Sequence, residues 1–180
     1  MKELSLNILD VTENSVKAGA SLTEILLEET EETLTITIRD NGCGMDEETV
    51  KSVIDPFYTT RTTRKVGLGV PLLKMAAEQT DGSFNVESSV KEENHGTVVT
   101  ALFYKHHLDF TPLGDIVSTL TTLIQGHPDT DFYFSHKKGG GEVTLDTREL
   151  REVLEGVPLN SYEVIKWIEE YLKEQYSLIG

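Results

Sequence analysis

The sequence predicts an α+β fold, and three observations carry that prediction. Residues 3–18 place apolar side chains at helical spacing, residues 20–40 hold two runs in which apolar and polar residues alternate, and residues 69–104 read as a helix followed by two more alternating runs. The expected order is helix, two strands, helix, loop, helix, two strands.

The first half of the chain shows clear boundaries between these elements. The first helix is expected to end at Gly19, and residues 20–30 and 32–40 are expected to form an antiparallel hairpin. Asp46 is placed to cap a short helix that runs to about Val53. Residues 55–69 (DPFYTTRTTRKVGLG) have no sustained period and are expected to form a functional loop.

The next elements follow the same reasoning. Residues 69–80 predict an amphipathic helix with Pro71 tolerated in its first turn, and residues 83–90 and 96–104 predict two strands.

Beyond residue 106 the sequence predicts a second set of helices and strands. A helix over 112–125, two short strands flanking KKGGG and two further helices near 147–155 and 160–176 predict a small helix-hairpin-helix α+β module. The expected division is 1–106 and 107–180, with no role evident for the second part. The KKGGG segment is expected to be a hairpin turn, because glycine adopts positive φ at little cost, and a phosphate-binding loop is the less favoured alternative.

Composition excludes several classes of function. The net charge is −15, which repels phosphate backbones and anionic lipids, so no nucleic-acid partner and no membrane are expected. A single cysteine rules out an internal disulfide and favours oxygen ligands for any metal. Without an apolar run of about 18 residues or a signal-like start, the protein is expected to be soluble and cytoplasmic.

Three groups of residues could carry chemistry. Asp10 and Asn14 lie four apart and share one helix face, although a solvated face with a Glu13–Lys17 ion pair is the simpler alternative. Asp40 ends a strand before two glycines that let a backbone approach a flat ligand, although Asp-Asn-Gly is also an ordinary turn.

The third group opens the helix of residues 69–80. Gly67 and Gly69 leave backbone NH groups free at a helix N-terminus, where the helix dipole favours a phosphate. A lone Gly-x-Gly is more often a tight loop, but Arg61, Arg64 and Lys65 precede this one in a chain poor in bases.

Taken together, these segments resemble a known family. NILDVTENSVKAGAS is similar to the N box of the gyrase, heat-shock chaperone, histidine kinase and MutL (GHKL) ATPase superfamily, DNGCGM to its first glycine box, DPFYTTR to the F box of histidine kinases and VGLGVPLLK to the second glycine box. The resemblance covers about residues 3–105 and implies a Bergerat-type fold, a two-layer α/β sandwich whose mostly antiparallel sheet is covered by helices.

The resemblance also implies ligands and residue roles. ATP with Mg²⁺ would be bound, Asn14 would coordinate the magnesium, Asp40 would accept the adenine amino hydrogen with the help of Thr97, and residues 59–61 would belong to the nucleotide lid. The full implied contact set is Asn14, Lys17, Asp40, Gly42, Gly44, Thr59, Thr60, Arg61, Gly67, Leu68, Gly69 and Thr97.

Catalysis is less certain from the resemblance than binding. Asp10 stands where hydrolytic members carry a glutamate that acts on water, and it is a methylene shorter, so its role as general base stays open. No histidine lies on a recognisable phosphoacceptor helix and the chain opens on the N box, so a complete histidine kinase is not expected.

Two functions remain in competition. The first is a Mg-ATP-binding regulatory protein that acts as a stand-alone ATPase or as a serine/threonine protein kinase of the anti-sigma type. The second is a non-catalytic module that senses ATP or ADP and controls a protein partner through its lid or its C-terminal module.

Overall fold

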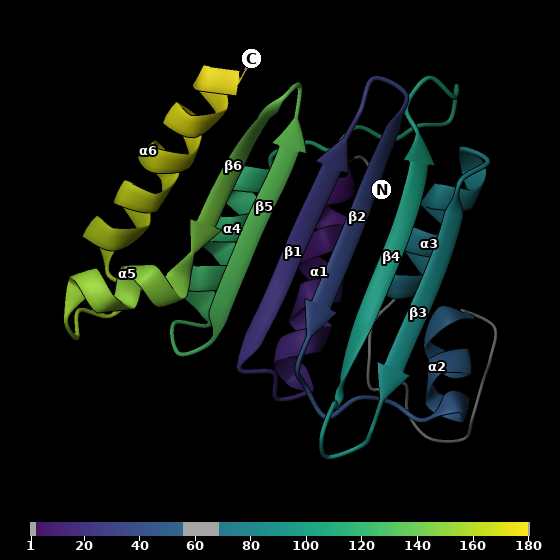
Figure 1. Cartoon of the computed structure of the whole chain (residues 1–180), viewed down its shortest axis with the longest axis horizontal. Helices are drawn as coiled ribbons and strands as arrows, with labels where there is room; N and C mark the ends of the chain where they lie inside the picture. The colour runs from purple at the N-terminus through teal and green to yellow at the C-terminus, as the bar shows by residue number, and fades with distance from the viewer. Residues whose placement is uncertain (1–2, 56–68, 180) are drawn as a thin grey trace.

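Residues 3–55 and 69–179 are described by a computed structural model, in which six strands form one mixed sheet (Figure 1). The expected α+β class is confirmed, and the helices and strands follow in the predicted order. Most of the expected functional loop of residues 55–69 lies outside the described residues. The helices are α1 (Leu4–Lys17), α2 (Glu47–Ile54), α3 (Gly69–Gln79), α4 (Ile116–Gly126), α5 (Thr147–Leu154) and α6 (Tyr162–Ile179). The strands are β1 (Leu22–Glu29), β2 (Thr33–Asp40), β3 (Ser83–Ser89), β4 (Gly96–Tyr104), β5 (Asp131–Lys138) and β6 (Gly141–Asp146).

The sheet is mostly antiparallel, as expected. Its strand order is β3-β4-β2-β1-β5-β6, and every neighbouring pair is antiparallel except β1 and β5. The register places Asp40 at the end of β2 opposite Thr97 near the start of β4. Two residues that are distant in the sequence are therefore brought together at one end of the sheet.

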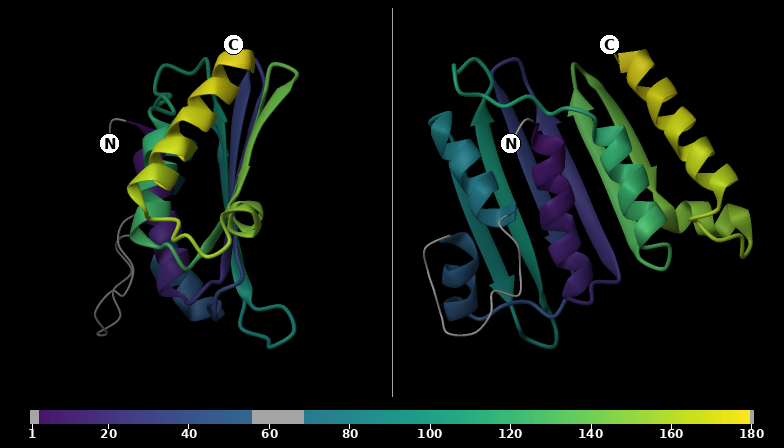
Figure 2. Two further views of the ribbon diagram at one scale, coloured as in Figure 1. Left: turned by 90° about the vertical axis from the view of Figure 1, so that its left-hand side faces the viewer. Right: turned by 180° about the vertical axis from the view of Figure 1, so that it is seen from behind.

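Alternation in β1 and β2 gives the sheet one buried face. Ile25 and Leu27 of β1 and Ile36 and Ile38 of β2 are each at most 1% exposed, whereas the residues between them stay partly accessible. Helices α1, α3, α4 and α6 all lie on that face (Figure 2). The result is a two-layer sandwich with the core between the helices and the sheet.

Helix ends follow the local sequence. Asp46 caps α2 by accepting a hydrogen bond from the Thr49 NH group, as predicted. Gly19 follows α1 with a φ of 80°, a left-handed conformation that glycine adopts without steric cost. The turn between β5 and β6 likewise uses positive φ at Gly139 and Gly140, so KKGGG forms the expected hairpin turn.

Residues 107–180 continue the sheet of the first half. Strand β5 pairs with β1 in parallel, from Leu22 opposite Asp131 to Glu29 opposite Lys138. Phe132 and Phe134 of β5 are buried in the same hydrophobic core as Ile25. The division after residue 106 stays a prediction about domains, but the two parts share one sheet and one core.

The segment before α4 supplies hydrogen-bond acceptors to the N-terminus of α1. The first free NH groups of α1, on Leu4 and Ser5, donate to the carbonyl oxygens of Pro112 and Leu113, both at 2.8 Å. These two bonds cap the N-terminus of α1 in place of a capping side chain. Helix α1 is thus held from its first turn by the second half of the chain.

The last helix is packed on one side and open on the other. Leu172 is fully buried, whereas Trp167 is 49% exposed and stacks on Tyr171 with ring centroids 5.1 Å apart.

Among the described residues, no helix is both long and apolar enough to cross a bilayer.

Candidate functional site

The described residues of the predicted site gather at one end of the sheet. Helix α1 ends there, β2 ends there at Asp40, and β4 begins there at Gly96, at the lower end of the sheet in Figure 1. Asn14 lies in the last turns of α1, and Thr97 lies opposite Asp40. The fold therefore brings Asn14, Asp40 and Thr97 to one place, although they belong to three separate elements.

The Asp40 carboxylate is fixed by two donors. Its Oδ2 accepts a hydrogen bond of 2.7 Å from the Ser15 hydroxyl, and its Oδ1 accepts one of 2.9 Å from the Gly42 NH group. Ser15 is 4% exposed, so its hydroxyl depends on this bond for a partner. A carboxylate oriented in this way keeps lone pairs for a further donor, such as the amino group of a base.

Asn14 has a half-buried side chain with one unpaired atom among the described residues. Its Nδ2 atom is buried, and among the described residues it has no hydrogen-bond partner. A buried NH₂ group without a partner costs free energy, and an acceptor atom of a bound ligand, such as a phosphate oxygen, would satisfy it. The amide oxygen is a hard donor of the kind that Mg²⁺ prefers, so this residue fits a magnesium ligand.

The two glycines of the loop after β2 are required by close packing within the protein. A β-carbon on Gly44 would overlap the main-chain oxygen of Ser89, and one on Gly42 would lie 2.9 Å from the Ala18 β-carbon. Sequence reasoning attributes these glycines to the approach of a flat ligand, whereas the neighbours seen here are the chain's own atoms. The glycines shape the loop that carries Asp40.

Three residues that the sequence analysis did not single out complete this loop. Ser15 holds Asp40, His95 contacts the Gly42 carbonyl oxygen through Nδ1 at 2.6 Å, and the Ser88 hydroxyl lies 2.7 Å from that of Thr97. All three contacts join residues far apart in the sequence or on different strands. The position of Ser15 next to Asn14 in the sequence is the one local feature that could have predicted any of these three residues.

Asp10 lies beside two charged groups of the same helix. Partial burial raises the pKa of the Asp10 carboxyl, the Glu13 carboxylate raises it further, and Lys17 lowers it in part. A carboxyl with a raised pKa is a stronger base than an ordinary aspartate. Asp10 is exposed and therefore accessible to a water molecule or a hydroxyl.

Glu13 pairs with a residue from the second half of the chain. Its carboxylate lies 2.8 Å from Nε2 of His127, which caps the C-terminus of α4. The alternative of a Glu13–Lys17 ion pair is therefore wrong in this structure. Lys17 remains exposed and acts on Asp10 through its charge.

The phosphate end of the predicted site is only partly described. Gly69 begins α3 against α1, and a β-carbon there would lie 2.7 Å from that of Asp10. Lys17 is also described, whereas five residues predicted for this end lie outside the described residues: Thr59, Thr60, Arg61, Gly67 and Leu68.

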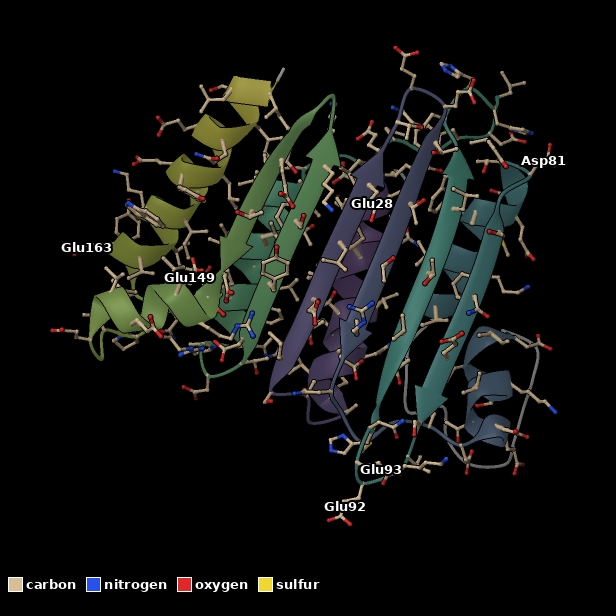
Figure 3. All side chains as sticks on the ribbon, viewed as in Figure 1. Glu28, Asp81, Glu92, Glu93, Glu149 and Glu163 are labelled. Carbon is tan, nitrogen blue, oxygen red and sulfur yellow. The ribbon has the colours of Figure 1, made fainter. Side chains whose placement is uncertain are left out.

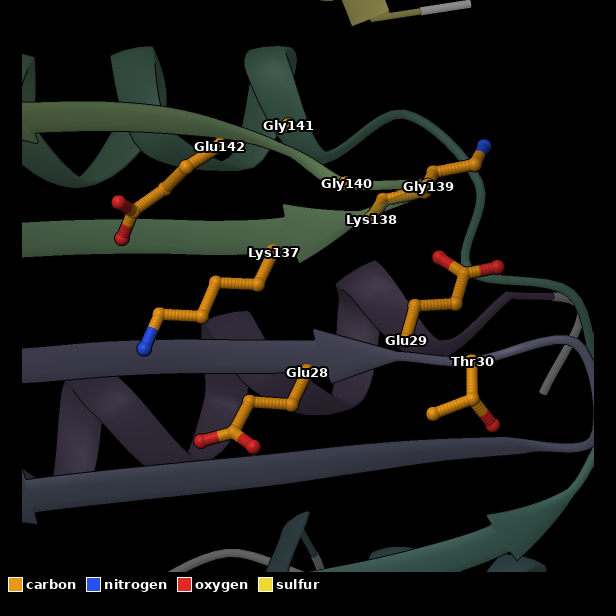
Figure 4. A pocket seen from close by; sticks show the side chains of 9 residues that line it. All are labelled: Glu28, Glu29, Thr30, Lys137, Lys138, Gly139, Gly140, Gly141 and Glu142. Carbon is orange, nitrogen blue, oxygen red and sulfur yellow. The ribbon is translucent and has the colours of Figure 1, made fainter.

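A cavity of about 450 Å³ lies at the opposite end of the sheet (Figure 4). Lys137 and Lys138 line it, together with the glycines of the β5–β6 turn, but so do the carboxylates of Glu28, Glu29 and Glu142. Those carboxylates oppose the binding of an anion. The cavity is remote from Asp40 and plays no part in the site.

The acidic excess lies on the outside of the molecule. Figure 3 labels six exposed acidic residues on different elements: Glu28, Asp81, Glu92, Glu93, Glu149 and Glu163. A surface of this charge repels polyanions, and the absence of a nucleic-acid partner stays a prediction.

Known proteins are similar to about half of this chain in sequence. The sensor histidine kinase YvrG of Bacillus subtilis (strain 168) is 37% identical over 98 residues, which cover 51% of this chain and 16% of YvrG. The tetrathionate sensor histidine kinase TtrS of Salmonella typhimurium (strain LT2) is 32% identical over 91 residues, which cover 50% of this chain and 15% of TtrS. The matched region thus spans about a sixth of the length of these relatives.

Two solved structures share the fold over more of the chain. The N-terminal domain of a DNA repair protein aligns with a TM-score of 0.57 and 18% identity over 81% of this chain and 53% of that chain. The Aquifex aeolicus MutL ATPase domain complexed with ADP aligns with a TM-score of 0.54 and 17% identity, over 86% of this chain and 70% of that chain. At such identities the likeness is one of fold.

A family model describes the part of the chain that forms the site. The model of the histidine kinase-, DNA gyrase B- and HSP90-like ATPases matches residues 2–107, which contain the described parts of the predicted site. The fold likeness to the MutL domain covers 86% of the chain and so extends beyond this match. From the family match and the Bergerat-type fold together, the chain belongs to the GHKL superfamily, the family of histidine kinase-, DNA gyrase B- and HSP90-like ATPases.

Proposed function

We propose that this protein binds ATP with Mg²⁺ at the end of the sheet where Asp40 and Asn14 meet. The observation that carries the proposal is the Asp40 carboxylate, held by the Ser15 hydroxyl and the Gly42 NH group in a loop shaped by glycine. The family match, and the ADP named for the MutL structure of the same fold, support adenine nucleotides as the ligand class.

Each described residue has a defined part in such binding. Asp40 would accept a hydrogen bond from the adenine amino group, and Thr97, which pairs with Asp40 in the sheet, would assist it. Asn14 would hold the magnesium ion through its amide oxygen. Bound Mg²⁺ neutralises charge on the nucleotide phosphates. Lys17 and the N-terminus of α3 at Gly69 would add favourable charge at the phosphate end.

We further propose that the bound nucleotide is used for phosphoryl transfer, by an ATPase or by a protein kinase of the anti-sigma type. The raised pKa of Asp10 supports this proposal, because such a carboxyl can take the proton from an attacking water or serine hydroxyl. The proton leaves the attacking oxygen as that oxygen bonds to the γ-phosphorus, and ADP departs.

A second candidate is a nucleotide sensor that controls a protein partner without turnover. It is favoured by the contacts between α1 and the second half of the chain, namely the caps from Pro112 and Leu113 and the pair of Glu13 with His127. A shift of α1 on nucleotide binding at Asn14 would be transmitted to residues 107–180 through these contacts.

Adenine recognition is tested by titrating wild-type protein and an Asp40→Asn variant with ATP and with GTP. Loss of a charge-assisted hydrogen bond predicts that the variant binds ATP about 10- to 100-fold more weakly. Asp129→Asn is the matched control, because Asp129 is exposed and none of the described residues bonds its side chain. Equal affinity of the wild type for ATP and GTP would contradict the assignment of Asp40.

Turnover is tested with labelled ATP, Mg²⁺ and candidate partner proteins. The ATPase or kinase proposal predicts released phosphate or labelled partner above the level of an Asn14→Ala variant, and a rate that differs between Asp10→Asn and Asp10→Glu. Binding without either product would favour the sensor.

A further inference from the structure

His95 lies in the turn between β3 and β4, 53 residues from the loop that it contacts. Its Nδ1 atom is 2.6 Å from the Gly42 carbonyl oxygen. Because a carbonyl oxygen only accepts, Nδ1 carries the hydrogen and donates it. A protonated imidazole also has a hydrogen on Nδ1, so the bond exists in both charge states of the ring.

This contact completes the restraint of the two consecutive peptide units that meet at Gly42, beside Asp40. The NH group of Gly42 donates to Asp40 Oδ1 at 2.9 Å, while its carbonyl oxygen accepts from His95. The next NH group, on Cys43, donates to the Ala18 carbonyl oxygen at 2.9 Å. Of these contacts, the His95 bond is the one made by a side chain that reaches the loop from another turn.

We propose that His95 is a positioning residue for the adenine end of the nucleotide site, acting on Asp40 through the backbone of Gly42. The proposal rests on the function proposed above. Without the imidazole, the Gly42–Cys43 peptide unit loses one of its two restraints and keeps the bond from the Cys43 NH group to Ala18. The backbone of Gly42 is then freer to turn, and the NH group of Gly42, in the preceding peptide unit, can move away from Asp40. Among the contacts of the described residues, the Ser15 hydroxyl is then the remaining fixed donor to the carboxylate.

The proposal predicts a defined pattern of nucleotide affinities. ATP and ADP share the base and differ at the γ-phosphate, so a residue that acts on the adenine end weakens both by the same factor. His95→Ala is expected to raise the dissociation constants of both about fivefold, which corresponds to about 1 kcal/mol. The ratio of the two constants should not change.

The experiment compares four proteins by calorimetric titration with Mg-ATP and Mg-ADP: wild type, His95→Ala, His95→Asn and His106→Ala. Asparagine retains an NH donor near the place of Nδ1, so His95→Asn should bind within about twofold of wild type. His106 is exposed beyond the far end of β4, and its variant is the matched control for loss of a surface histidine. Amide hydrogen exchange without nucleotide is followed at Gly42 and Cys43.

Each outcome bears on the proposal. Equal weakening of ATP and ADP in His95→Ala, recovery in His95→Asn and faster exchange at Gly42 and Cys43 would support it. If the wild type binds and His95→Ala matches it, or loses only ATP affinity, the role of His95 is refuted and the proposed function stands. If the wild type binds neither nucleotide, the proposed function fails, and the role of His95 fails with it.

Discussion

The strongest test of how the two halves of the chain are joined is the substitution His136→Ala. His136 lies in β5, is 2% exposed and bridges two other elements. Its Nε2 lies 2.9 Å from Glu29 Oε1 in β1, and its Nδ1 lies 2.7 Å from the Tyr176 hydroxyl in α6. Because a carboxylate only accepts, Nε2 carries the hydrogen, and Nδ1 of the neutral ring accepts the tyrosine OH.

The magnitude follows from what the substitution removes. Two hydrogen bonds are lost, each worth about 1 kcal/mol, and a buried ring is replaced by a cavity. Glu29 keeps its ion pair with Lys105 at 2.7 Å, so its charge is not left alone. A destabilisation of about 3 to 4 kcal/mol is expected, against about 1 kcal/mol for Tyr176→Phe, which keeps the ring and loses one bond.

The assay is urea unfolding at pH 7.5, followed by circular dichroism. His106→Ala is the control, since the exposed His106 should change the free energy of unfolding by less than about 0.5 kcal/mol. An early, separate transition in His136→Ala would mean that residues 107–180 detach first. A loss below about 1 kcal/mol for His136→Ala would refute the view that this cluster holds the two halves together.

Three further outcomes are expected. Burial lowers the pKa of His136. Burial alone would raise the pKa of Glu29, but hydrogen bonds from Lys105 and His136 hold that pKa below its ordinary value. Each group therefore contributes its full stabilisation at a pH above its pKa in the unfolded chain, and loses it as the pH falls. Wild-type stability should therefore fall as the pH drops below about 6.5, and a flat profile between pH 7 and pH 5 in urea titrations would count against this. Asn7 is 1% exposed with both amide atoms unpaired among the described residues, so Asn7→Leu should raise the free energy of unfolding by about 1 to 2 kcal/mol; a lower urea midpoint would contradict it. Gly44 has a φ of 78°, and a β-carbon there would overlap a main-chain oxygen, so Gly44→Ala should lower the free energy of unfolding by more than about 2 kcal/mol and weaken ATP binding. Gly126 has open space around it, so Gly126→Ala should leave the free energy of unfolding unchanged or raise it.

Local patterns predict most of the elements. The helical spacing of residues 3–18, the alternation in β1 and β2 and the cap at Asp46 are each read over a few residues, and each agrees with the structure. The placement of Asp40 at the end of a strand follows from the same alternation.

Contacts between distant residues could not be predicted in this way. The parallel pairing of β1 with β5 joins strands about 110 residues apart, and no local period distinguishes it from a hairpin that stands alone. The partner of Glu13 is His127 for the same reason, whereas the spacing of the helix alone favours Lys17. The contact of His95 with Gly42 depends on the β3–β4 turn, whose position is fixed by the sheet.

The central claim is that Asp40 and Asn14 form a magnesium-dependent adenine nucleotide site. The measurement that tests it most directly is calorimetric titration of the wild type and of Asn14→Ala with ATP and ADP, each with Mg²⁺ and with a chelator. We predict one nucleotide per chain, tighter with Mg²⁺ for the wild type, and little effect of Mg²⁺ on Asn14→Ala. Absence of binding by the wild type at millimolar ATP and ADP, or an unchanged magnesium effect in Asn14→Ala, would contradict the account.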